Sequence, residues 1–519
     1  MITRRRVLKV AAGVGLAPLL PSLSGCGDTS SGYDGPLGPE NLFEHGVASG
    51  DPLADAVVLW TRVSPAAPGP VEVSWWVAGD PEGRGVVARG RVATDASRDH
   101  TVKLDATGLR PGTTYWYGFE ALGRRSPTGR TRTAPVGGVE RLRFGVVSCS
   151  FYAAGWFHAY RSLADRDDLD LVLHLGDYIY EYGYDGVRPV EPRREIVTLE
   201  DYRTRYSQYR RDPDLQRLHG LQPFVTVWDD HESANNSWRG GAQNHDPATE
   251  GSWEERRAAA ARAYSEWMPI RDQEDGRIFR SFRFGDLVDL VMLDTRIWGR
   301  DEQTGTTGNP LVRDPSRQLL GADQEAWLVD RLRESTARWR IVGQQVMMAP
   351  LKVVPGAESA GGGTTLNPDQ WDGYVAARKR FLDAVRRENP SNLVVLTGDI
   401  HTSWANEIAE DPNDPAAYDP ATGRGAAGVE FVATSVTSPG IPGIDNAFVP
   451  TVKAANPHIK WADLQHRGYV VVDVTPERTQ GAWFHFDRVD VPEGVVETFA
   501  KAFSVRDGET LLREDPSPA

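Results

Sequence analysis

The feature that most constrains this chain is the way in which five apolar segments end. From about residue 141 onward, strand-type segments alternate with helix-type segments, which predicts a layered α/β domain built on a buried sheet. Acidic, His, Tyr or Cys residues follow five of the strand-type segments directly. These segments are 144–147, 171–175, 224–228, 287–293 and 393–396.

The residues that follow the five segments are of the kinds that bind metal ions. They are 148–150, 176–180, 229–232, 294–296 and 397–401. Sites in open α/β sheets form beyond the carboxyl ends of the strands, so we expect these residues to meet. One such ending is explained by turn chemistry, because Asp often starts a turn, but five in one domain are not. Several carboxylates held close together need a cation between them, so the sequence predicts a site with more than one metal ion.

The ligand types in these segments indicate which metals to expect. Thiolate, phenolate and carboxylate together form an anionic set that suits a trivalent ion, and a tyrosinate favours ferric iron over zinc. Spare carboxylate and amide oxygens suit calcium or magnesium. Cys149 is one of only two cysteines, and a free thiol in an exported protein needs an explanation.

The first residues have the pattern of an export signal. Arg4, Arg5 and Arg6 precede an apolar segment, 10–23, that is too short for a confident membrane-spanning helix and resembles a twin-arginine signal. The sequence Leu23-Ser24-Gly25-Cys26 resembles a bacterial lipobox. We therefore expect residues 1–25 to be removed and Cys26 to be lipidated. The alternative is an unmodified Cys26 in an ordinary signal peptide.

The rest of the chain divides by composition. Residues 26–40 are rich in Gly, Pro, Ser and Asp and predict a tether, and 41–135 contain short strand-type segments typical of an immunoglobulin- or fibronectin-like sandwich. Residues 141–490 form the α/β domain, and 491–519 are expected to be a charged tail. Helices are expected at 252–267, where Ser252 and Glu255 form a capping box, at 323–337 and at 369–387.

Composition excludes several classes of function. The chain is 40% hydrophobic and 25% charged, which excludes a wholly disordered chain and a polytopic membrane protein. Its net charge of −14 argues against binding to nucleic acid through a basic surface. The sequence lacks the G-x-S-x-G, Walker A and H-E-x-x-H motifs of common rival enzymes. We expect a monomer without a specific nucleic-acid partner.

Taken together, the motifs resemble those of the PhoD-like alkaline phosphatase and phosphodiesterase family, from about Phe43 to the end of the α/β domain. The residues that carry the resemblance are Gly46-Val47-Ala48-Ser49-Gly50-Asp51-Pro52, Leu59-Trp60-Thr61-Arg62, Ser148-Cys149-Ser150, Gly176-Asp177-Tyr178-Ile179-Tyr180-Glu181, Trp228-Asp229-Asp230-His231-Glu232, Asn235-Asn236 and Thr397-Gly398-Asp399-Ile400-His401. The resemblance implies a four-layer αββα metallophosphoesterase-like core that holds one ferric ion and one or two calcium ions.

The resemblance also implies a role for individual residues. Cys149 and Tyr180 look like iron ligands, and Asp177 looks like the carboxylate that bridges iron to calcium. The remaining metal shell looks like Asp230, Asn236, Asp399 and His401, whose division between the ions stays open. His231 looks like the residue near the phosphate that assists the leaving group.

Three alternatives remain open at this stage. Asp229 could be the ligand in place of Asp230, and Asn235 in place of Asn236. Asp294 and Arg296 are expected to hold the strand end together, with a phosphate contact by Arg296 as the weaker possibility. His466 and His485 have no ligand-like spacing that would assign them a role.

The sequence therefore predicts an exported phosphoesterase that attacks phosphate esters with a metal-bound hydroxide. It would pass through the twin-arginine translocase and stay at the outer face of the cytoplasmic membrane, in the periplasm or at the cell surface through a lipid on Cys26. One alternative is a phospholipase D-like diesterase acting on phospholipids or teichoic-acid-like polymers. A remote alternative is a non-catalytic surface lipoprotein that binds through its sandwich.

Overall fold

The computed structural model describes residues 35–388 and 391–519. The expectations for the signal peptide 1–25, for Cys26 and for most of the tether 26–40 lie outside the described residues. No helix in these two ranges is both long and apolar enough to cross a membrane.

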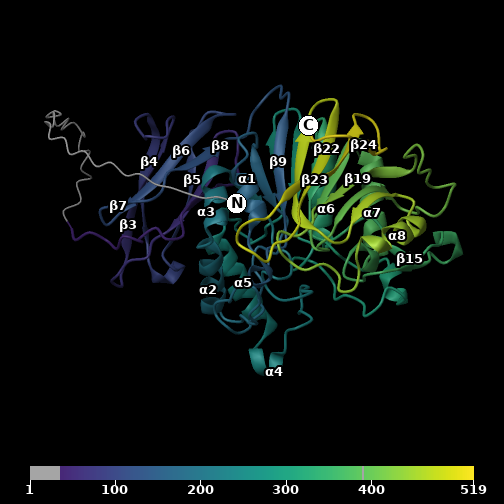
Figure 1. Cartoon of the computed structure of the whole chain (residues 1–519), viewed down its shortest axis with the longest axis horizontal. Coiled ribbons are helices and arrows are strands. Elements are labelled where there is room, and N and C mark those ends of the chain that lie inside the picture. Colours follow the sequence, from purple (N-terminus) through teal and green to yellow (C-terminus); the bar gives the residue numbers. More distant parts are fainter. Residues whose placement is uncertain (1–34, 389–390) are drawn as a thin grey trace, which may run out of the picture.

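Two large sheets form the centre of the molecule (Figure 1). The first has ten strands in the order β24-β23-β22-β21-β9-β10-β11-β1-β2-β5. Its strands are β1 (Val47–Gly50), β2 (Ala56–Arg62), β5 (Thr101–Thr107), β9 (Leu142–Val147), β10 (Leu171–His174), β11 (Pro223–Thr226), β21 (Arg467–Val474), β22 (Arg478–Phe486), β23 (Glu497–Arg506) and β24 (Arg513–Asp515).

The second sheet has seven strands in the order β12-β13-β14-β17-β19-β18-β20. They are β12 (Arg280–Phe284), β13 (Val288–Met292), β14 (Trp339–Gly343), β17 (Leu393–Thr397), β18 (Ser403–Ala409), β19 (Ala426–Val432) and β20 (Ile459–Asp463). A small hairpin of β15 (Lys352–Val354) and β16 (Thr364–Thr365) lies apart from it.

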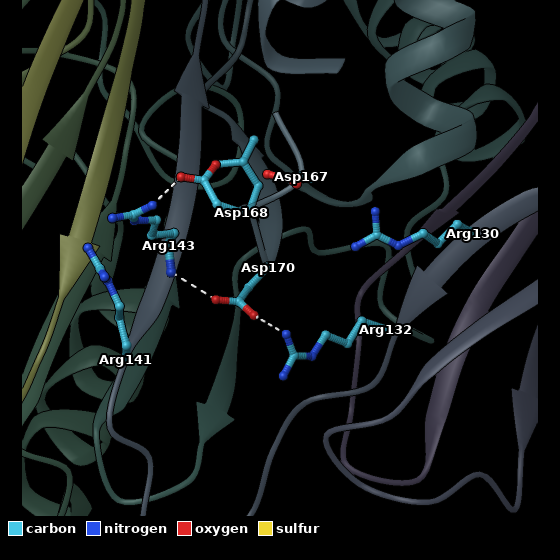
Figure 2. Close-up of a pocket in the computed structure, with 8 residues that line it drawn as sticks. Arg130, Arg132, Arg141, Arg143, Asp167, Asp168 and Asp170 are labelled. Atoms are coloured by element: carbon cyan, nitrogen blue, oxygen red, sulfur yellow. Dashed lines mark hydrogen bonds and ion pairs between the residues drawn. The ribbon is translucent and has the colours of Figure 1, made fainter. Parts of the chain in front are cut away.

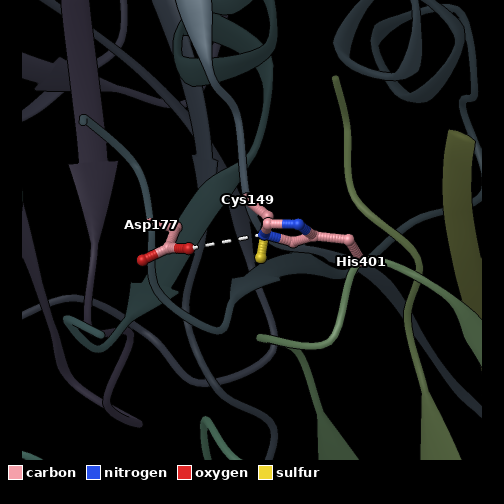
Figure 3. A group of neighbouring side chains, drawn as sticks. All are labelled: Cys149, Asp177 and His401. Carbon is pink, nitrogen blue, oxygen red and sulfur yellow. Dashed lines mark ion pairs between the residues drawn. The ribbon is translucent and has the colours of Figure 1, made fainter. Parts of the chain in front are cut away.

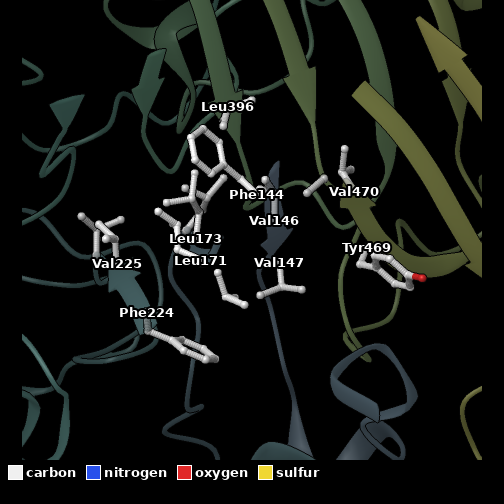
Figure 4. Packing of buried hydrophobic residues seen from close by; sticks show 14 of the residues in the cluster. Phe144, Val146, Val147, Leu171, Leu173, Phe224, Val225, Leu396, Tyr469 and Val470 are labelled. Carbon is white, nitrogen blue, oxygen red and sulfur yellow. The ribbon is translucent and has the colours of Figure 1, made fainter. Parts of the chain in front are cut away.

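The main hydrophobic core lies between these two sheets. In Figure 4, Phe144, Leu173 and Val470 of the ten-stranded sheet lie near Leu396 of β17 in the seven-stranded sheet. These side chains are almost wholly buried. Burying one such side chain stabilises the fold by roughly 1.5–3 kcal/mol, so the face-to-face packing fixes how the two sets of strand ends meet.

Helices cover the outer faces of both sheets, which confirms the expected αββα layers. α1 (His158–Ala164) and α3 (Pro213–Leu221) share the core of the first sheet, as do α2 (Leu199–Arg210) and α5 (Trp253–Trp267). On the second sheet, α6 (Ala322–Glu334) and α7 (Val375–Glu388) bury their apolar faces against β13, β14 and β17. The short helices α4 (Pro247–Glu250) and α8 (Val449–Ala455) lie in connecting segments.

The N-terminal β-region forms a sandwich that shares a sheet with the α/β domain. One sheet of the sandwich contains β3 (Val71–Ala78), β4 (Val86–Thr94), β6 (Thr114–Ala121), β7 (Arg124–Arg125) and β8 (Gly129–Arg132). The strands opposite are β1, β2 and β5, and β1 pairs in parallel with β11. Gly50 fits this junction because a Cβ there would lie 2.2 Å from the carbonyl oxygen of Pro269.

Ion pairs reinforce the same junction, as Figure 2 shows. Arg132 of β8 lies 2.6 Å from one carboxylate oxygen of Asp170, and the backbone N–H of Arg143 donates to the other at 2.9 Å. Asp51 and Arg280 form a buried pair at 2.6 Å. These contacts join the sandwich to the α/β core through side chains as well as through the shared sheet.

Two expectations about boundaries are wrong. The segment 491–519 is not a tail, because 497–506 and 513–515 add two strands to the sheet and bury Ala502, Phe503 and Val505. The third expected helix begins at Val375 and not at Asp369. Asp369 stays in a loop because its carboxylate is bound by Arg296 and Arg300. The capped helix α5 and the helix α6 lie where they were expected.

Candidate metal centre and active site

The five strand ends meet at one side of the molecule. β9, β10 and β11 run parallel in one sheet, and β13, β14 and β17 run parallel in the other. A cavity of about 370 Å³ lies at this side, and residues that follow β10, β11 and β17 line it. The cavity is lined by Asp177, Asp230, His231, Asn235, Asn236, Leu366, Asn367, Asp369, Asp399, Ile400, His401 and Ile441. Five of the seven predicted metal ligands are in this lining.

Most of the predicted ligands sit on strained backbone. Cys149, Asp177, Asn236, Asp399 and His401 all have φ between 51° and 65°, in the left-handed region that residues other than glycine seldom adopt. Such strain costs about 1–3 kcal/mol per residue and persists only where the surroundings enforce it, which is typical of functional sites. The strand-end turns therefore hold these side chains in positions that stability alone would not select.

One half of the site brings together a thiol, a phenol, a carboxylate and an imidazole. The ligand atoms of Cys149, Asp177 and His401 all lie within 4.8 Å of one another (Figure 3). The hydroxyl of Tyr180 donates to Asp177 Oδ2 at 2.8 Å and lies 3.2 Å from His401 Nε2. Ser438 donates to the Tyr180 oxygen at 2.6 Å. These four side chains come from three strand ends that are distant in sequence.

The protons on His401, Cys149 and Tyr180 are arranged so that these side chains could bind a cation. His401 Nδ1 lies 2.8 Å from the carbonyl oxygen of Pro439, which can only accept, so Nδ1 carries the proton and Nε2 presents its lone pair to the site. Burial, together with the charge of Asp177, raises the pKa of the Cys149 thiol and of the Tyr180 phenol well above their ordinary values. Deprotonating both requires a strong positive charge between them, so the donor set fits a trivalent metal ion.

The other half of the site is a cluster of carboxylates around one guanidinium. Arg296 is fully buried and forms ion pairs with Asp229, with Asp369 at 2.7 Å, with Asp399 at 2.6 Å and with Asp230 at 3.5 Å. Arg300 adds a second cation beside Asp369. Four carboxylates against two guanidinium groups leave an excess of negative charge.

The pKa values of the cluster reflect burial first, and then the opposing effects of Arg296 and the neighbouring carboxylates. Burial raises the pKa of Asp399 to about 6 and that of Asp229 well above its ordinary value. Burial opposes ionisation of Asp230 as well, but Arg296 and His231 outweigh it and lower the pKa of that carboxyl. Asp229 Oδ2 is buried and has no hydrogen-bond partner among the described residues. The cluster therefore lacks positive charge, which one or more oxygen-bound cations would supply.

The geometry bears on the three open alternatives. Asp230 and both asparagines line the cavity, whereas Asp229 lies behind it against Arg296. Nε, Nη1 and Nη2 of Arg296 all donate to these carboxylates, and its backbone N–H donates to Asp294 at 2.8 Å. Arg296 therefore holds the strand ends together, and it is buried behind the residues that line the cavity.

His231 lies at the edge of the cavity with a carboxylate behind it. Its Nδ1 is 2.6 Å from Glu181 Oε2, and its ring stacks on Tyr180 with 4.1 Å between centroids. Burial alone would lower the pKa of His231, but Glu181, Asp230 and Asp177 outweigh burial and raise that pKa well above its ordinary value. His231 is therefore set up to carry a proton.

Four residues of the site were not predicted in these roles. Glu181 orients His231, and Ser438 binds Tyr180. Glu232 accepts the backbone N–H groups of Asp177 at 3.0 Å and of Asp229 at 2.8 Å, and so joins two strand-end turns. Asp369 completes the carboxylate cluster. Glu181 and Glu232 stand inside motifs that had been singled out, whereas no local pattern marks Asp369 or Ser438.

Comparison with known proteins agrees with this architecture. A family model described as PhoD-like phosphatase matches residues 144–483, and one described as PhoD-like phosphatase, N-terminal domain, matches residues 35–135. Alkaline phosphatase D of Bacillus subtilis (strain 168) is 38% identical over 503 residues, which cover 91% of this chain and 82% of that protein.

The chain belongs to the PhoD-like phosphatase family. A solved structure described as "Structure of PhoD" has a TM-score of 0.85 at 36% identity, and the match covers 93% of this chain and 94% of that one. The relationship makes this chain a phosphoric ester hydrolase. The part matched by the phosphatase model contains Cys149, Asp177, Tyr180, Asp230, His231, Asn236, Asp399 and His401.

We predict that Arg296→Met lowers the free energy of unfolding by about 3–5 kcal/mol, because it leaves buried carboxylates without their cation. Urea unfolding of the chelated protein measures this. The control is Arg488→Met, which removes an exposed pair with Asp490 and should change stability little. Equal urea midpoints for the two variants would show that the carboxylates do not depend on Arg296.

Proposed function

We propose that this phosphatase is metal-dependent and acts outside the cytoplasm, hydrolysing phosphate esters at the cavity between the strand ends. The observation that carries the proposal is the convergence of Cys149, Asp177, Tyr180 and His401 beside a carboxylate cluster that lacks positive charge. A thiol, a phenol and several acids buried together have no evident structural use without a cation.

The proposed metal content is one ferric ion with one or two calcium ions. Cys149 and Tyr180 would hold the iron, and Asp177 would bridge it to calcium. Asp230, Asn236, Asp399 and His401 would complete the shell, with their division between the ions open. The anionic, soft and phenolic donors support iron at one end, and the oxygen-rich cluster supports calcium at the other. When bound, the metals would polarise the phosphoryl group and supply hydroxide at neutral pH.

The chain's own groups provide the rest of the chemistry. Glu181 forms a hydrogen bond with Nδ1 of His231. The other ring nitrogen of His231, Nε2, can therefore give a proton to the departing oxygen of the ester. Ring stacking on Tyr180 fixes the plane of the imidazole. Asp177 accepts the Tyr180 hydroxyl and a long hydrogen bond from the His231 backbone N–H, 3.4 Å, so it links proton donor and ligand set.

The apolar residues in the cavity lining support a phosphodiesterase as the second candidate function. Leu366, Ile400 and Ile441 line the same cavity as the acids, and the side chain of Leu366 is largely exposed. An apolar wall beside a phosphate site favours esters that carry an apolar group, such as phospholipids. The phospholipase D-like alternative therefore remains, with teichoic-acid-like polymers as the less apolar substrates.

The function is tested by rates on a bis-aryl phosphate, an aryl phosphate and phospholipid vesicles, before and after chelation. We expect hydrolysis that chelation abolishes and that added metal restores. Preference for vesicles would favour the phospholipase D-like alternative. A metal-replete protein that hydrolyses none of the three would contradict the proposal and favour the non-catalytic surface lipoprotein.

We predict that Tyr180→Phe shifts or removes a visible charge-transfer band, and that Cys149→Ala lowers the iron content. Both changes remove an anionic donor to the metal. Absorption spectra and elemental analysis of the natively exported protein measure them. Tyr182→Phe is the matched control, because its ring lies near Tyr180 but is not in the ligand set. A colourless wild type that contains only zinc would contradict the assignment.

We predict that Glu181→Gln lowers kcat far more for alkyl than for aryl esters. A poor alkyl leaving group depends on a proton from His231, whereas an aryl oxide does not, and general-acid assistance is worth about 10²–10⁴-fold. Glu195→Gln is the control, since Glu195 shares the Asn244 contact but does not touch His231. An equal loss for both ester types would assign Glu181 a purely structural role.

Export through the twin-arginine translocase and attachment through a lipid on Cys26 are part of the same proposal. The support is the pattern of residues 4–26. We predict that Cys26→Ser moves the protein from the membrane fraction to the soluble exported fraction, with activity retained. Unchanged fractionation would contradict lipidation. We also propose a monomer, which light scattering of the purified protein tests.

A further inference from the structure

A second group of metal-binding side chains lies outside the cavity described above. Asp463 ends β20, His466 lies in the turn that follows, and His485 lies on β22 of the other sheet. One ligand atom from each lies within 4.8 Å of the other two. His485 is 19 residues beyond His466 in sequence. The three side chains come together because β20 and β22 belong to different sheets that pack against each other.

The carboxylate of Asp463 is fixed in place. Its Oδ1 accepts the backbone N–H groups of Gln465 at 3.0 Å and His466 at 2.8 Å. Its Oδ2 accepts from Asn446 Nδ2 at 2.9 Å and faces Nδ1 of His466 at 2.9 Å and Nδ1 of His485 at 3.9 Å. One oxygen anchors the turn, and the other points between two imidazoles.

The distance between His485 Nδ1 and Asp463 Oδ2 indicates room for an ion between them. His485 Nε2 lies 3.0 Å from Ser403 Oγ, and in one of the two neutral tautomers Nε2–H donates to that hydroxyl. In that tautomer Nδ1 presents a lone pair to the Asp463 carboxylate across 3.9 Å, which is too long for a hydrogen bond. The two electron-pair donors then face each other across a gap that a cation bound to both would fill. The parallel rings of His466 and His485, 5.4 Å apart, border the same space.

The geometry points to a second metal site, in which Asp463, His466 and His485 bind a zinc-class divalent transition metal. Two imidazoles and one carboxylate form a ligand set that favours zinc and its neighbours over calcium or magnesium. Ser403 and Asn446 are the outer partners that orient the ligands, as second partners do in metal sites.

The site has an open position. His485 and Asp463 are buried, but the His466 side chain is 36% exposed. His466 also lines a cavity of about 300 Å³ together with Arg467 and Arg488. Three protein ligands leave the fourth position of a tetrahedral ion for water or for an anion that enters this cavity.

The site is connected to the proposed active centre through Thr434. The Thr434 hydroxyl lies 2.7 Å from the carbonyl oxygen of His466 and 3.2 Å from that of His401. A metal that fixes the 463–466 turn would thereby also stabilise the backbone at His401. We assign the second site a stabilising role, which does not depend on the proposed chemistry at the first site.

The test uses the purified protein with its own metals retained, titrated with Co²⁺ as a spectroscopic substitute for zinc. Wild type and the exposed-loop control Gln465→Ala should each bind one further equivalent with the visible absorption of a tetrahedral ion. His466→Ala and His466→Gln should both lose it. Ser403→Ala should bind about 10–100-fold more weakly, because it loses an outer partner.

Thermal unfolding gives a second readout. Added Zn²⁺ should raise the Tm of wild type and of Gln465→Ala but not of the His466 variants, since only a metal bound to the native state stabilises it. Equal Co²⁺ uptake and equal Tm shifts in wild type and both His466 variants would overturn the proposal and leave an ordinary His466–Asp463 ion pair. Hydrolysis assayed on the same samples separates this result from a failure of the first site.

Discussion

The arrangement of the whole site depends on the compensation of buried negative charge. Arg296 pairs with four largely buried carboxylates that come from three separate segments of the chain. Charges so close repel strongly at low dielectric, and two guanidinium groups do not neutralise four acids. The strained turns after β9, β10 and β17 persist because the packed sheets fix the strand ends. The fold therefore supplies the energy that holds a cation site together.

The sequence was sufficient for the features that are local. Strand periodicity and polar strand endings predicted β9, β10, β11, β13 and β17 and the residues that follow them, and the Ser252 capping box predicted the start of α5. Parallel strands place their carboxyl ends together, so the meeting of Cys149, Asp177 and His401 followed from topology. The metal assignment came from ligand chemistry and from resemblance, and it stays a prediction.

The features that could not be predicted from the sequence depend on contacts between residues far apart in the chain. Arg296 meets Asp399 across 103 residues, and Glu181 meets His231 across 50 residues. The segment of β23 was expected to belong to a charged tail, and it is a strand because it pairs with the edge of β22 and with β24. Asp463 and His485 come together only because β20 and β22 lie in different sheets that pack face to face.

The most direct test of the proposed ferric centre is anomalous diffraction from crystals of the protein purified with its own metals, recorded at the iron absorption edge. We predict one strong iron peak bounded by Cys149 Sγ, the Tyr180 hydroxyl oxygen and Asp177, with lighter calcium density toward Asp230 and Asp399. An empty thiol–phenol pocket, or a peak that appears only at the zinc edge there, would contradict the claim that these strand ends evolved to hold a ferric centre.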